Sequence, residues 1–416
     1  QSTRQLLEED NRPLANWQNI QLEDGPAVQT VENTLMPEIF EQNTRYDALN
    51  RPLEIHNWRR QGTEAAVYVP QYNRRGALYS ETIRVRGAVS QAIENIEYDA
   101  KGQRTRIRYG NGTSTRYTYD PLNFRLLRLF TTAKNGTDIL QDLNYTYDPV
   151  GNITQIEDLA QDTVFFANQQ IKPINAFEYD ALYRLIRAKG REHVNSTSAG
   201  PGPDSGNLTG KIPQPGDKAL RKYTQCYTYD PAGNFVEMKH LVNTETGATG
   251  TGWTRTYITD PLSNRLLSTL TTNGENVQVD YNYDAHGNML NFANVASSLY
   301  NYWDYRDMIR SLDLLGGGRA WYQYDGSKQR TRKLVRRDNN EYWERIYLGG
   351  YELYRRYANN RLEEETETHH LFADEQRILI VEDKRVENSS FILHHSSLQR
   401  YQYSNHLGSV NLECNA

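Results

Sequence analysis

A run of carboxylates and imidazoles near the C-terminus has the residue types of a metal or acid–base site. Glu363, Glu365, Glu367 and His369 alternate along the sequence LEEETETHH, so on a β-strand they would share one face. Carboxylate oxygens suit hard cations and can act as general acids or bases. His370 would point to the opposite face. A solvated acidic edge explains the same alternation, and we favour it over a metal site.

A second group combines imidazoles with hydroxyls. His394 and His395 precede Ser396 and Ser397, which are the components of a nucleophilic site. The two rings would point to opposite faces of a strand, and the sequence places no Asp or Glu to orient either one. We therefore interpret both as structural histidines. His406, in the sequence SNHLGS, is expected to lie in a turn whose side chains hydrogen-bond locally.

Basic residues also alternate along the chain. They occur at Arg104, Arg106 and Arg108, and again at Lys328, Arg330 and Arg332. Among 30 tyrosines, such runs could bind single-stranded nucleic acid by stacking and phosphate contacts. The spacing of two and the 52 acidic residues favour an ordinary strand face, solvated or paired across strands. A formal net charge of −5 also gives no indication of a nucleic-acid or membrane partner.

The remaining chemistry-bearing residues predict no cofactor and no metal. Cys226 and Cys414 lie too far apart for a disulfide framework or a metal-binding spacing, so we interpret them as incidental thiols. No segment approaches the roughly 18 apolar residues of a membrane span, and the start, QSTRQLLEEDNRP, does not resemble a signal peptide. The chain begins without Met, so we expect a processed piece whose targeting signals lie elsewhere.

The elements that must position these residues are indicated by a repeated Tyr-Asp pair followed by a turn. The copies are Tyr46-Asp47, Tyr98-Asp99, Tyr119-Asp120, Tyr147-Asp148, Tyr179-Asp180, Tyr229-Asp230, Tyr283-Asp284 and Tyr324-Asp325, with variants at Thr259-Asp260 and Trp303-Asp304. Uninterrupted copies lie roughly 20 to 30 residues apart, which is typical of an array of small supersecondary units.

One copy shows how each unit should fold. Tyr117 and Tyr119 are two residues apart and share a strand face, and Asp120-Pro121 then begins a turn. In other copies a Gly-Asn pair, such as Gly151-Asn152, supplies the position at which φ can become positive. Each unit is therefore predicted to be a β-hairpin. The tyrosines of the repeat, such as Tyr147, Tyr229 and Tyr283, are predicted to pack between neighbouring hairpins.

The fold class that follows is all-β. Hairpins that are marginal alone should pair edge to edge into a long antiparallel sheet, with almost no helix beyond residue 40. Because twist accumulates and open edges aggregate, the sheet should curve around a cavity. We expect a lead-in segment at 1–40, with the best prospect of helix, and a repeat strip at 41–416. Gly/Ser/Thr/Pro-rich stretches at 195–217 and 243–252 are expected to be mobile insertions.

This ordered series resembles the Rhs/YD-repeat family, and within it the shell-forming B and C components of insecticidal Tc toxin complexes. The segments that carry the resemblance are NIEYDAKGQRTRIRYGNGTSTRYTYDPLNFRLLRL (95–129), LNYTYDPVGNITQIED (143–158), YDALYRLIRAKGREH (179–193), RIYLGGYELYR (345–355) and LQRYQYSNHLGSVNL (398–412). The resemblance as a whole covers roughly residues 40–412, in the order that the family would show.

The resemblance implies a hollow Rhs/YD-repeat shell, secreted as part of a toxin complex, that encloses a toxic C-terminal polypeptide. Its partners would be other shell components and the enclosed polypeptide, with no nucleic acid and no direct membrane insertion by this chain. In the family an aspartyl-type self-cleavage follows the shell. The Arg and Asp residues of that site have no counterpart here, so no catalytic residue is assigned and no enzymatic activity is expected. The alternatives are a secreted YD-repeat carbohydrate-active or glycan-binding protein and a teneurin-like adhesion module.

Overall fold

The protein consists almost entirely of antiparallel β-strands. Its computed structural model describes residues 2–6, 35–194, 219–242, 252–273, 275–337, 339–387 and 393–416. Within these ranges the only helical element is one 3₁₀ turn, η3 (Ser297–Leu299), so the predicted scarcity of helix beyond residue 40 is confirmed for the described chain. None of the described residues forms a helix able to span a membrane. Most of the lead-in segment at 1–40, where helix was expected, lies outside the described residues, and so do the expected insertions at 195–217 and 243–252, except for Gly252.

The chain forms two compact units, one of residues 1–114 and 301–416 and the other of residues 115–300. In the first unit, each N-terminal strand pairs antiparallel with the next one in the chain. These strands are β1 (Ser2–Arg4), β2 (Phe40–Tyr46), β3 (Pro52–Arg60), β4 (Val67–Tyr72), β5 (Leu78–Val85), β6 (Ala88–Tyr98) and β7 (Arg104–Tyr109).

The C-terminal part of the first unit is a ten-stranded antiparallel sheet. Its strands follow one another in chain order: β21 (Tyr302–Trp303), β22 (Ile309–Asp313), β23 (Arg319–Tyr324), β24 (Arg330–Arg336), β25 (Glu341–Leu348), β26 (Tyr351–Ala358), β27 (Arg361–Ala373), β28 (Gln376–Glu387), β29 (Leu393–Ser404) and β30 (Val410–Asn415).

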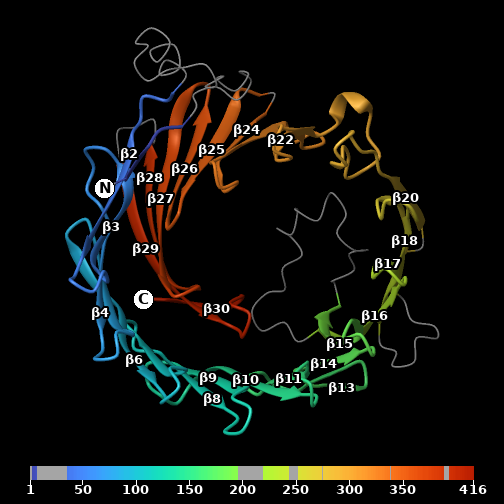
Figure 1. Ribbon diagram of the computed structural model, residues 1–416, viewed down its shortest axis with the longest axis horizontal. Helices are drawn as coiled ribbons and strands as arrows, with labels where there is room; N and C mark the ends of the chain where they lie inside the picture. The colour runs from blue at the N-terminus through green and yellow to red at the C-terminus, as the bar shows by residue number, and fades with distance from the viewer. Residues whose placement is uncertain are drawn as a thin grey trace. The chain divides into compact units, whose positions relative to one another are not determined.

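The two sheets of the first unit pack face to face. Figure 1 shows the blue strands β2 and β3 beside the orange and red strands β26 to β28, and β3 contacts β26 directly. Phe40 and Trp58 from the N-terminal strands form one buried cluster with Ile346, Leu348 and Leu353 from the C-terminal sheet. The alternation of strand side chains thus gives each sheet one apolar face that the other sheet covers.

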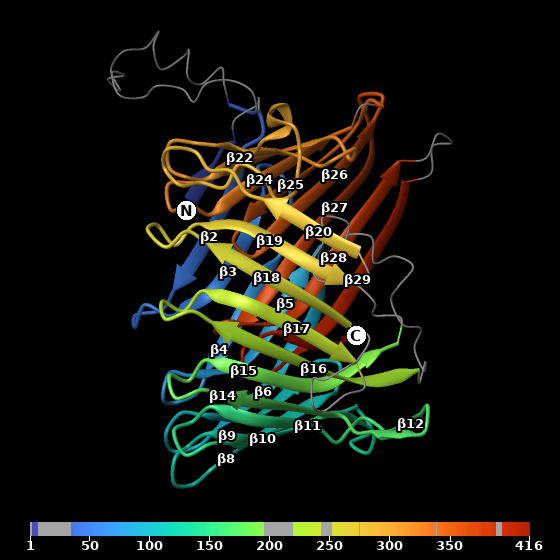
Figure 2. The same ribbon diagram turned by 90° about the vertical axis from the view of Figure 1, so that its right-hand side faces the viewer.

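The second unit is built from one β-meander and a separate short hairpin. Its strands are β8 (Ser114–Tyr119), β9 (Leu126–Thr132), β10 (Ile139–Tyr147), β11 (Ile153–Asp158), β12 (Val164–Phe166), β13 (Gln169–Ile171), β14 (Ile174–Tyr179), β15 (Leu185–His193), β16 (Leu220–Tyr229), β17 (Phe235–Val242), β18 (Gly252–Thr259), β19 (Leu266–Asn273) and β20 (Glu275–Asp280). From β14 to β20 each strand pairs antiparallel with the next, as the successive ribbons of Figure 2 show. The separate hairpin is β12–β13.

A β-bulge recurs at the tyrosine of the repeat. The strand register shifts by one residue at Tyr98, Tyr147, Tyr179, Tyr229 and Tyr324, and also at Thr259 of a variant copy. A bulge bends its strand and increases the local right-handed twist. The repeat therefore places an identical distortion at the same point of successive hairpins.

Candidate functional site

The carboxylate of each repeat closes its own turn. Oδ1 of Asp148 accepts hydrogen bonds from the main-chain N–H groups of Gly151 (2.7 Å) and Asn152 (2.8 Å), and Oδ2 accepts one from the Asn152 side chain (2.7 Å). Gly151 adopts φ +114°, in the region that favours glycine. In another copy, the side-chain amide of Asn234 is the main cause that lowers the pKa of Asp230. The turn thus stabilises the charged carboxylate, and the carboxylate stabilises the turn.

The other repeat carboxylates form equivalent turns. Asp99 accepts from the N–H groups of Lys101 and Gln103, Asp120 from Leu122, Asp180 from Leu182 and Arg184, Asp284 from His286 and Asn288, and Asp325 from Ser327 and Gln329. Seven of the repeat tyrosines end a strand, whereas Tyr283 forms an isolated bridge to Met289; the seven are Tyr46, Tyr98, Tyr119, Tyr147, Tyr179, Tyr229 and Tyr324.

The tyrosine of a copy joins its hairpin to the preceding one. Tyr229 Oη donates a 2.7 Å hydrogen bond to the main-chain oxygen of Leu185. The Arg184 guanidinium lies over the Tyr229 ring, with Cζ 4.8 Å from the centroid, and donates to the main-chain oxygen of Asp230 (3.2 Å). We call this combination of a hydroxyl bond and a covering arginine the Tyr–Arg staple.

The complete staple recurs in the second unit at Tyr147 and Tyr283, and the hydroxyl bond also occurs at Tyr98 in the first unit and at Tyr179. Hydroxyl bonds of 2.7 or 2.8 Å join Tyr98 to Leu78, Tyr147 to Leu126, Tyr179 to Ile153 and Tyr283 to Leu266. Arg125 covers the Tyr147 ring and Arg265 covers that of Tyr283. Each hydroxyl bond and each cation–π contact contributes about 1 kcal/mol. Because the staples repeat, their sum is large for a sheet whose individual hairpins are marginal.

Two copies of the turn carry Asn in place of Asp, and we missed them as copies in the sequence. Asn73 Oδ1 accepts from the N–H groups of Arg75 (2.9 Å) and Ala77 (3.1 Å). Asn405 Oδ1 accepts likewise from Leu407 (2.9 Å) and Ser409 (3.1 Å), so the local turn expected around His406 is confirmed. The shared ability of Asn and Asp to accept bonds from the following backbone was the available signal.

The acidic run on β27 is neither a metal site nor a solvated edge. Arg60 donates to Oε1 of Glu365 (2.8 Å) and to Oε1 of Glu367 (3.0 Å), and Arg355 donates to Oε2 of Glu365 (3.0 Å). The Glu365 side chain is only 6% exposed. The expected solvated edge was wrong because these carboxylates lie between the two sheets of the first unit, where arginines from β3 and β26 reach them.

These residues belong to a larger set, which we call the charge layer, and five of its members, Arg332, Glu344, Arg355, Glu365 and Asp383, are buried. The layer comprises Glu38, Arg60, Arg86, Arg332, Glu344, Arg355, Glu365, Glu367 and Asp383, all connected by ion pairs within the first unit. Guanidinium groups therefore take the carboxylate oxygens that a cation would need. In the part of the chain that the structure describes, no cluster of His, Cys, Asp or Glu is arranged to hold a metal ion.

The other members of the run diverge from this layer. Glu363 is 38% exposed and pairs with Arg356 (2.8 Å), since the strand register shifts at the bulge next to Arg356. His369 is buried, its Nδ1 lies 3.4 Å from Asn57 Nδ2, and burial lowers the pKa of His369 to about 4, so the ring is neutral. His370 contacts Glu352 (3.2 Å) and Arg377 (3.4 Å) instead of the charge layer.

The remaining candidates do not assemble a reactive centre. His394 and His395 lie in β29 opposite Val386 and Arg385, but their side chains and that of Ser396 lie outside the described residues. Cys226 and Cys414 are free thiols.

The basic runs are separated by pairing and by bulges. Arg104 donates to Gln376 Oε1 (3.1 Å) and pairs with Asp374, while Arg106 donates to Ser114 (3.1 Å). Arg332 is buried against Glu344 (2.8 Å), whereas Arg330 is exposed and lies over Tyr347. The two arginines separate because the bulge at Tyr324 places an extra residue between their register positions.

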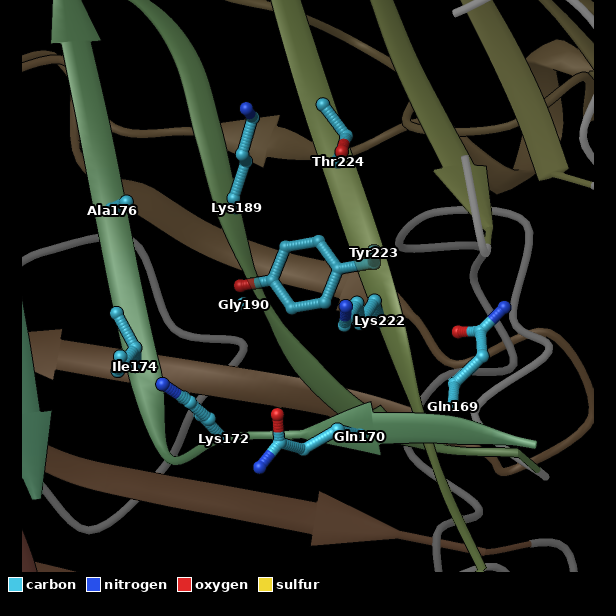
Figure 3. A pocket seen from close by; sticks show the side chains of 10 residues that line it. All are labelled: Gln169, Gln170, Lys172, Ile174, Ala176, Lys189, Gly190, Lys222, Tyr223 and Thr224. Atoms are coloured by element: carbon cyan, nitrogen blue, oxygen red, sulfur yellow. The ribbon is translucent and has the colours of Figure 1, made fainter. Parts of the chain in front are cut away.

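A pocket of about 410 Å³ lies in the second unit where β13 meets β14, β15 and β16. Figure 3 shows Lys172, Lys189 and Lys222 around it, with the Tyr223 ring directed toward Gly190. A Cβ on Gly190 would lie 2.6 Å from Asn175 Oδ1 and 2.8 Å from the Tyr223 hydroxyl, so a larger residue there would displace these two side chains.

Comparison with known proteins places these features in a family. The model of the RHS Repeat matches residues 98–137. Toxin subunit YenC2 of Yersinia entomophaga is 32% identical over 372 residues, covering 84% of this chain and 35% of that protein. Toxin subunit YenC1 of the same organism is 30% identical over 334 residues, covering 76% of this chain and 32% of that protein. The chain spans about a third of the length of these curated relatives.

Solved structures give the same relationship. The crystal structure of TcdB2-TccC3 matches 99% of this chain and 19% of that chain, with a TM-score of 0.79 and 25% identity. The Photorhabdus luminescens Tc holotoxin pore matches 99% of this chain and 18% of that chain, with a TM-score of 0.77 and 26% identity. The recurrent turn and staple therefore occur on a backbone similar to that of Tc toxin proteins.

Proposed function

Because this chain belongs to the Rhs repeat family, we propose that it is a wall segment of a Tc-type toxin shell that encloses a toxic polypeptide and helps to deliver it. The observation that supports this proposal most directly is the Tyr–Arg staple. It joins hairpin to hairpin through side chains and main chain alike, so that a sheet can extend over many strands.

The chemistry of the described residues fits a container better than a catalyst. Glu365 and Glu367 of the acidic run are held by arginines in the charge layer, and the repeat aspartates are held by turn N–H groups. A buried carboxylate that is ionised and fully paired has no free lone pair directed at a substrate. We propose that the segment itself is not enzymatic and that catalysis belongs to the enclosed polypeptide.

The partners follow from the same proposal. We infer that other shell components complete the wall, and that the assembly acts outside the producing cell as a secreted toxin complex. The described residues of this chain take no part in membrane insertion in this proposal, since its strands are committed to sheet pairing within each unit.

The decisive experiment measures enclosure. The complete gene, including sequence downstream of this segment, is expressed, and the purified particle is treated with protease in the presence and absence of mild denaturant. A downstream polypeptide that resists digestion until the shell opens is the expected result. A polypeptide that is digested at the same rate in both conditions would contradict enclosure.

A second measurement concerns the size of the particle formed by this chain alone. A filled globule of this length has a radius of gyration of about 22 Å. A wall segment should give a clearly larger value in small-angle scattering. A value near that of the filled globule, together with turnover of polysaccharide substrates, would instead favour a glycan-active protein.

A further inference from the structure

One face of the ten-stranded sheet carries three positive charges, Arg330, Lys333 and Arg345, of which only Arg345 pairs with a carboxylate among the described residues. The charge layer lies on the face that packs against the N-terminal strands. Alternation places a different cross-strand row on the opposite face, in which Tyr322 pairs with Lys333, Lys333 with Arg345, and Arg345 with Tyr354. Arg330 joins this row, since its guanidinium lies over both Tyr322 and Tyr347. We call these residues the cation–tyrosine row.

Lys333 and Arg345 are direct cross-strand partners, and like charges in that position destabilise a sheet. Among the described residues, no carboxylate lies within ion-pair distance of Arg330 or Lys333. Burial, followed by the charges of Arg330 and Arg345, lowers the pKa of Lys333. The row therefore keeps a repulsion that a neutral residue at position 333 would remove.

The nearest acid does not relieve this repulsion. Glu352 accepts a hydrogen bond from Arg345 (2.7 Å) and contacts His370 (3.2 Å). Burial raises the pKa of Glu352, but the bonds to His370 and Arg345 dominate and lower it to about 2. Its charge is thus committed to Arg345 and His370, and Arg330 and Lys333 remain available to an external anion.

The geometry also indicates which kind of anion fits. The Tyr347 and Tyr354 rings each have one face covered by an arginine, at 4.5 and 5.3 Å, and a base or a sugar could not stack on that face. The groups left available are N–H donors of Arg330 and Lys333. Guanidinium and ammonium donors form strong charge-assisted bonds with carboxylates.

Arg330 and Lys333 lie on the same strand, opposite Tyr324 and Tyr322, which are alternate residues of β23. Alternate residues of a strand are separated by about 6.6 Å, and so are alternate side chains of an extended peptide. An acidic extended segment can therefore bring successive carboxylates to Arg330 and Lys333. We propose that the cation–tyrosine row is a binding site for an acidic, extended polypeptide segment. Its assignment to the enclosed polypeptide rests on the proposed function, whereas the carboxylate site itself does not.

The test measures fluorescence anisotropy of a labelled peptide of alternating Glu and Ser, titrated with the purified full chain at low salt. Lys333→Met keeps the aliphatic stem against Tyr322 but removes the charge. We expect it to weaken binding by about tenfold, the loss of one charge-assisted bond, and Arg330→Gln to have a similar effect. Lys384→Met is the matched control, because Lys384 lies on β28, two strands beyond β26 in the same sheet, and already pairs with Glu364 (2.8 Å).

Thermal melts provide the second readout. Lys333→Met should melt at the same or a higher temperature than the unmodified chain, because it removes like-charge repulsion. A lower melting temperature would mean that the Lys333 charge is structural and would overturn the proposal. Unchanged peptide binding in both variants would overturn it as well.

Two further probes separate the possible sources of negative charge. A Gln-for-Glu peptide should not bind. The second probe is a heparin fragment or an oligothymidylate. If it binds more tightly than the Glu peptide and its binding also depends on Lys333, the row is a general polyanion surface, and the proposal of a site for an acidic polypeptide is overturned. If the chain does not bind the Glu peptide but the particle still encloses its polypeptide, this inference fails and the proposed function stands. If the chain binds the peptide but no polypeptide is enclosed, the proposed function fails and the carboxylate site stands.

Discussion

The Tyr229 hydroxyl lies 2.7 Å from the main-chain oxygen of Leu185, although the two residues are separated by 44 positions. Leu185 opens β15 and Tyr229 closes β16, so the bond joins the turn-proximal ends of two adjacent strands. The side chain of one repeat thus satisfies the backbone of another at the place where the register shifts and a carbonyl would otherwise lack a partner.

Replacement of Tyr229 measures the staple. Tyr229→Phe removes only the hydroxyl bond and should cost no more than about 1.5 kcal/mol, whereas Tyr229→Ala also removes the packed ring and should cost about 3 kcal/mol or more. Urea denaturation gives both values. Tyr305→Ala is the control, since that ring is 75% exposed and its loss should be nearly neutral. Equally small losses of unfolding free energy for Tyr229→Ala and Tyr305→Ala would show that the staple does not stabilise the fold.

The turn glycines allow backbone strain to be separated from side-chain displacement. Gly233 (φ +94°) has no atom within 4 Å of an added Cβ, whereas a Cβ on Gly151 (φ +114°) would lie 2.8 Å from Nη2 of Arg125. Gly233→Ala should cost about 1 kcal/mol from left-handed strain alone. Gly151→Ala should cost about 1 kcal/mol more, because Arg125 must leave the Asp148 carbonyl. Identical melting temperatures for the two variants would argue against a role for Arg125.

Acid should weaken the repeat turns. Hydrogen bonds from the turn, with the Asn234 side chain first, lower the pKa of Asp230 below its ordinary value. The stabilisation is therefore fully present above the unfolded pKa of about 3.9 and is lost as the pH falls through the lower folded value. Asp230→Asn keeps an acceptor that does not titrate, so its urea midpoint should fall less steeply below pH 4 than that of the unmodified chain. Parallel curves would show that Asp230 does not contribute to acid sensitivity.

The charge layer should be intolerant of single deletions. Arg355 pairs with both Glu344 (3.3 Å) and Glu365 (3.0 Å), and its side chain is 7% exposed. Arg355→Met leaves these carboxylates buried without compensation and should cost about 3 to 5 kcal/mol. Arg356→Met at the next residue, where the side chain is 39% exposed, should cost less than about 1 kcal/mol. Comparable losses in denaturation experiments would contradict the burial of the layer.

His369 predicts a separate pH dependence in a higher range. Burial lowers its folded pKa to about 4, whereas the unfolded value is about 6.5. Between these values only the unfolded chain binds the proton, so stability should decrease as the pH falls from about 6.5 to about 4 and the contribution should then level off. His369→Gln should flatten this part of the curve of unfolding free energy against pH. A curve with an unchanged slope would place the titration elsewhere.

The sequence was most informative where structure is local. Asp148 and Gly151 determine a turn within a few residues, and that turn is present as expected. The staple was not predicted, because its arginine and the carbonyl that accepts from it have no constant separation in the sequence. The separation is 23 residues for Arg125 but 46 for Arg184. Insertions change this spacing while the contact stays the same, so no fixed period identifies the arginine and its acceptor.

Long-range burial reversed another sequence-based interpretation. Arg60 and Glu365 are 305 positions apart, and no local pattern indicates that one will neutralise the other. The acidic run on β27 therefore looked like a solvated edge. Arg330 and Arg332 similarly looked like residues of one face, until the bulge at Tyr324 placed one against Tyr347 and the other against Glu344.

The staple also has a direction. In each of the hydroxyl bonds described, the donor belongs to the later hairpin and the acceptor to an earlier one, as for Tyr147 and Leu126 or Tyr283 and Leu266. A ribosome synthesises the acceptor first, so each emerging hairpin meets a template that is already in place. The second unit can consequently grow by accretion in the order of translation, whereas the Arg60–Glu365 pair must wait until the C-terminal sheet exists. Vectorial synthesis and sheet growth are thereby matched, one hairpin at a time.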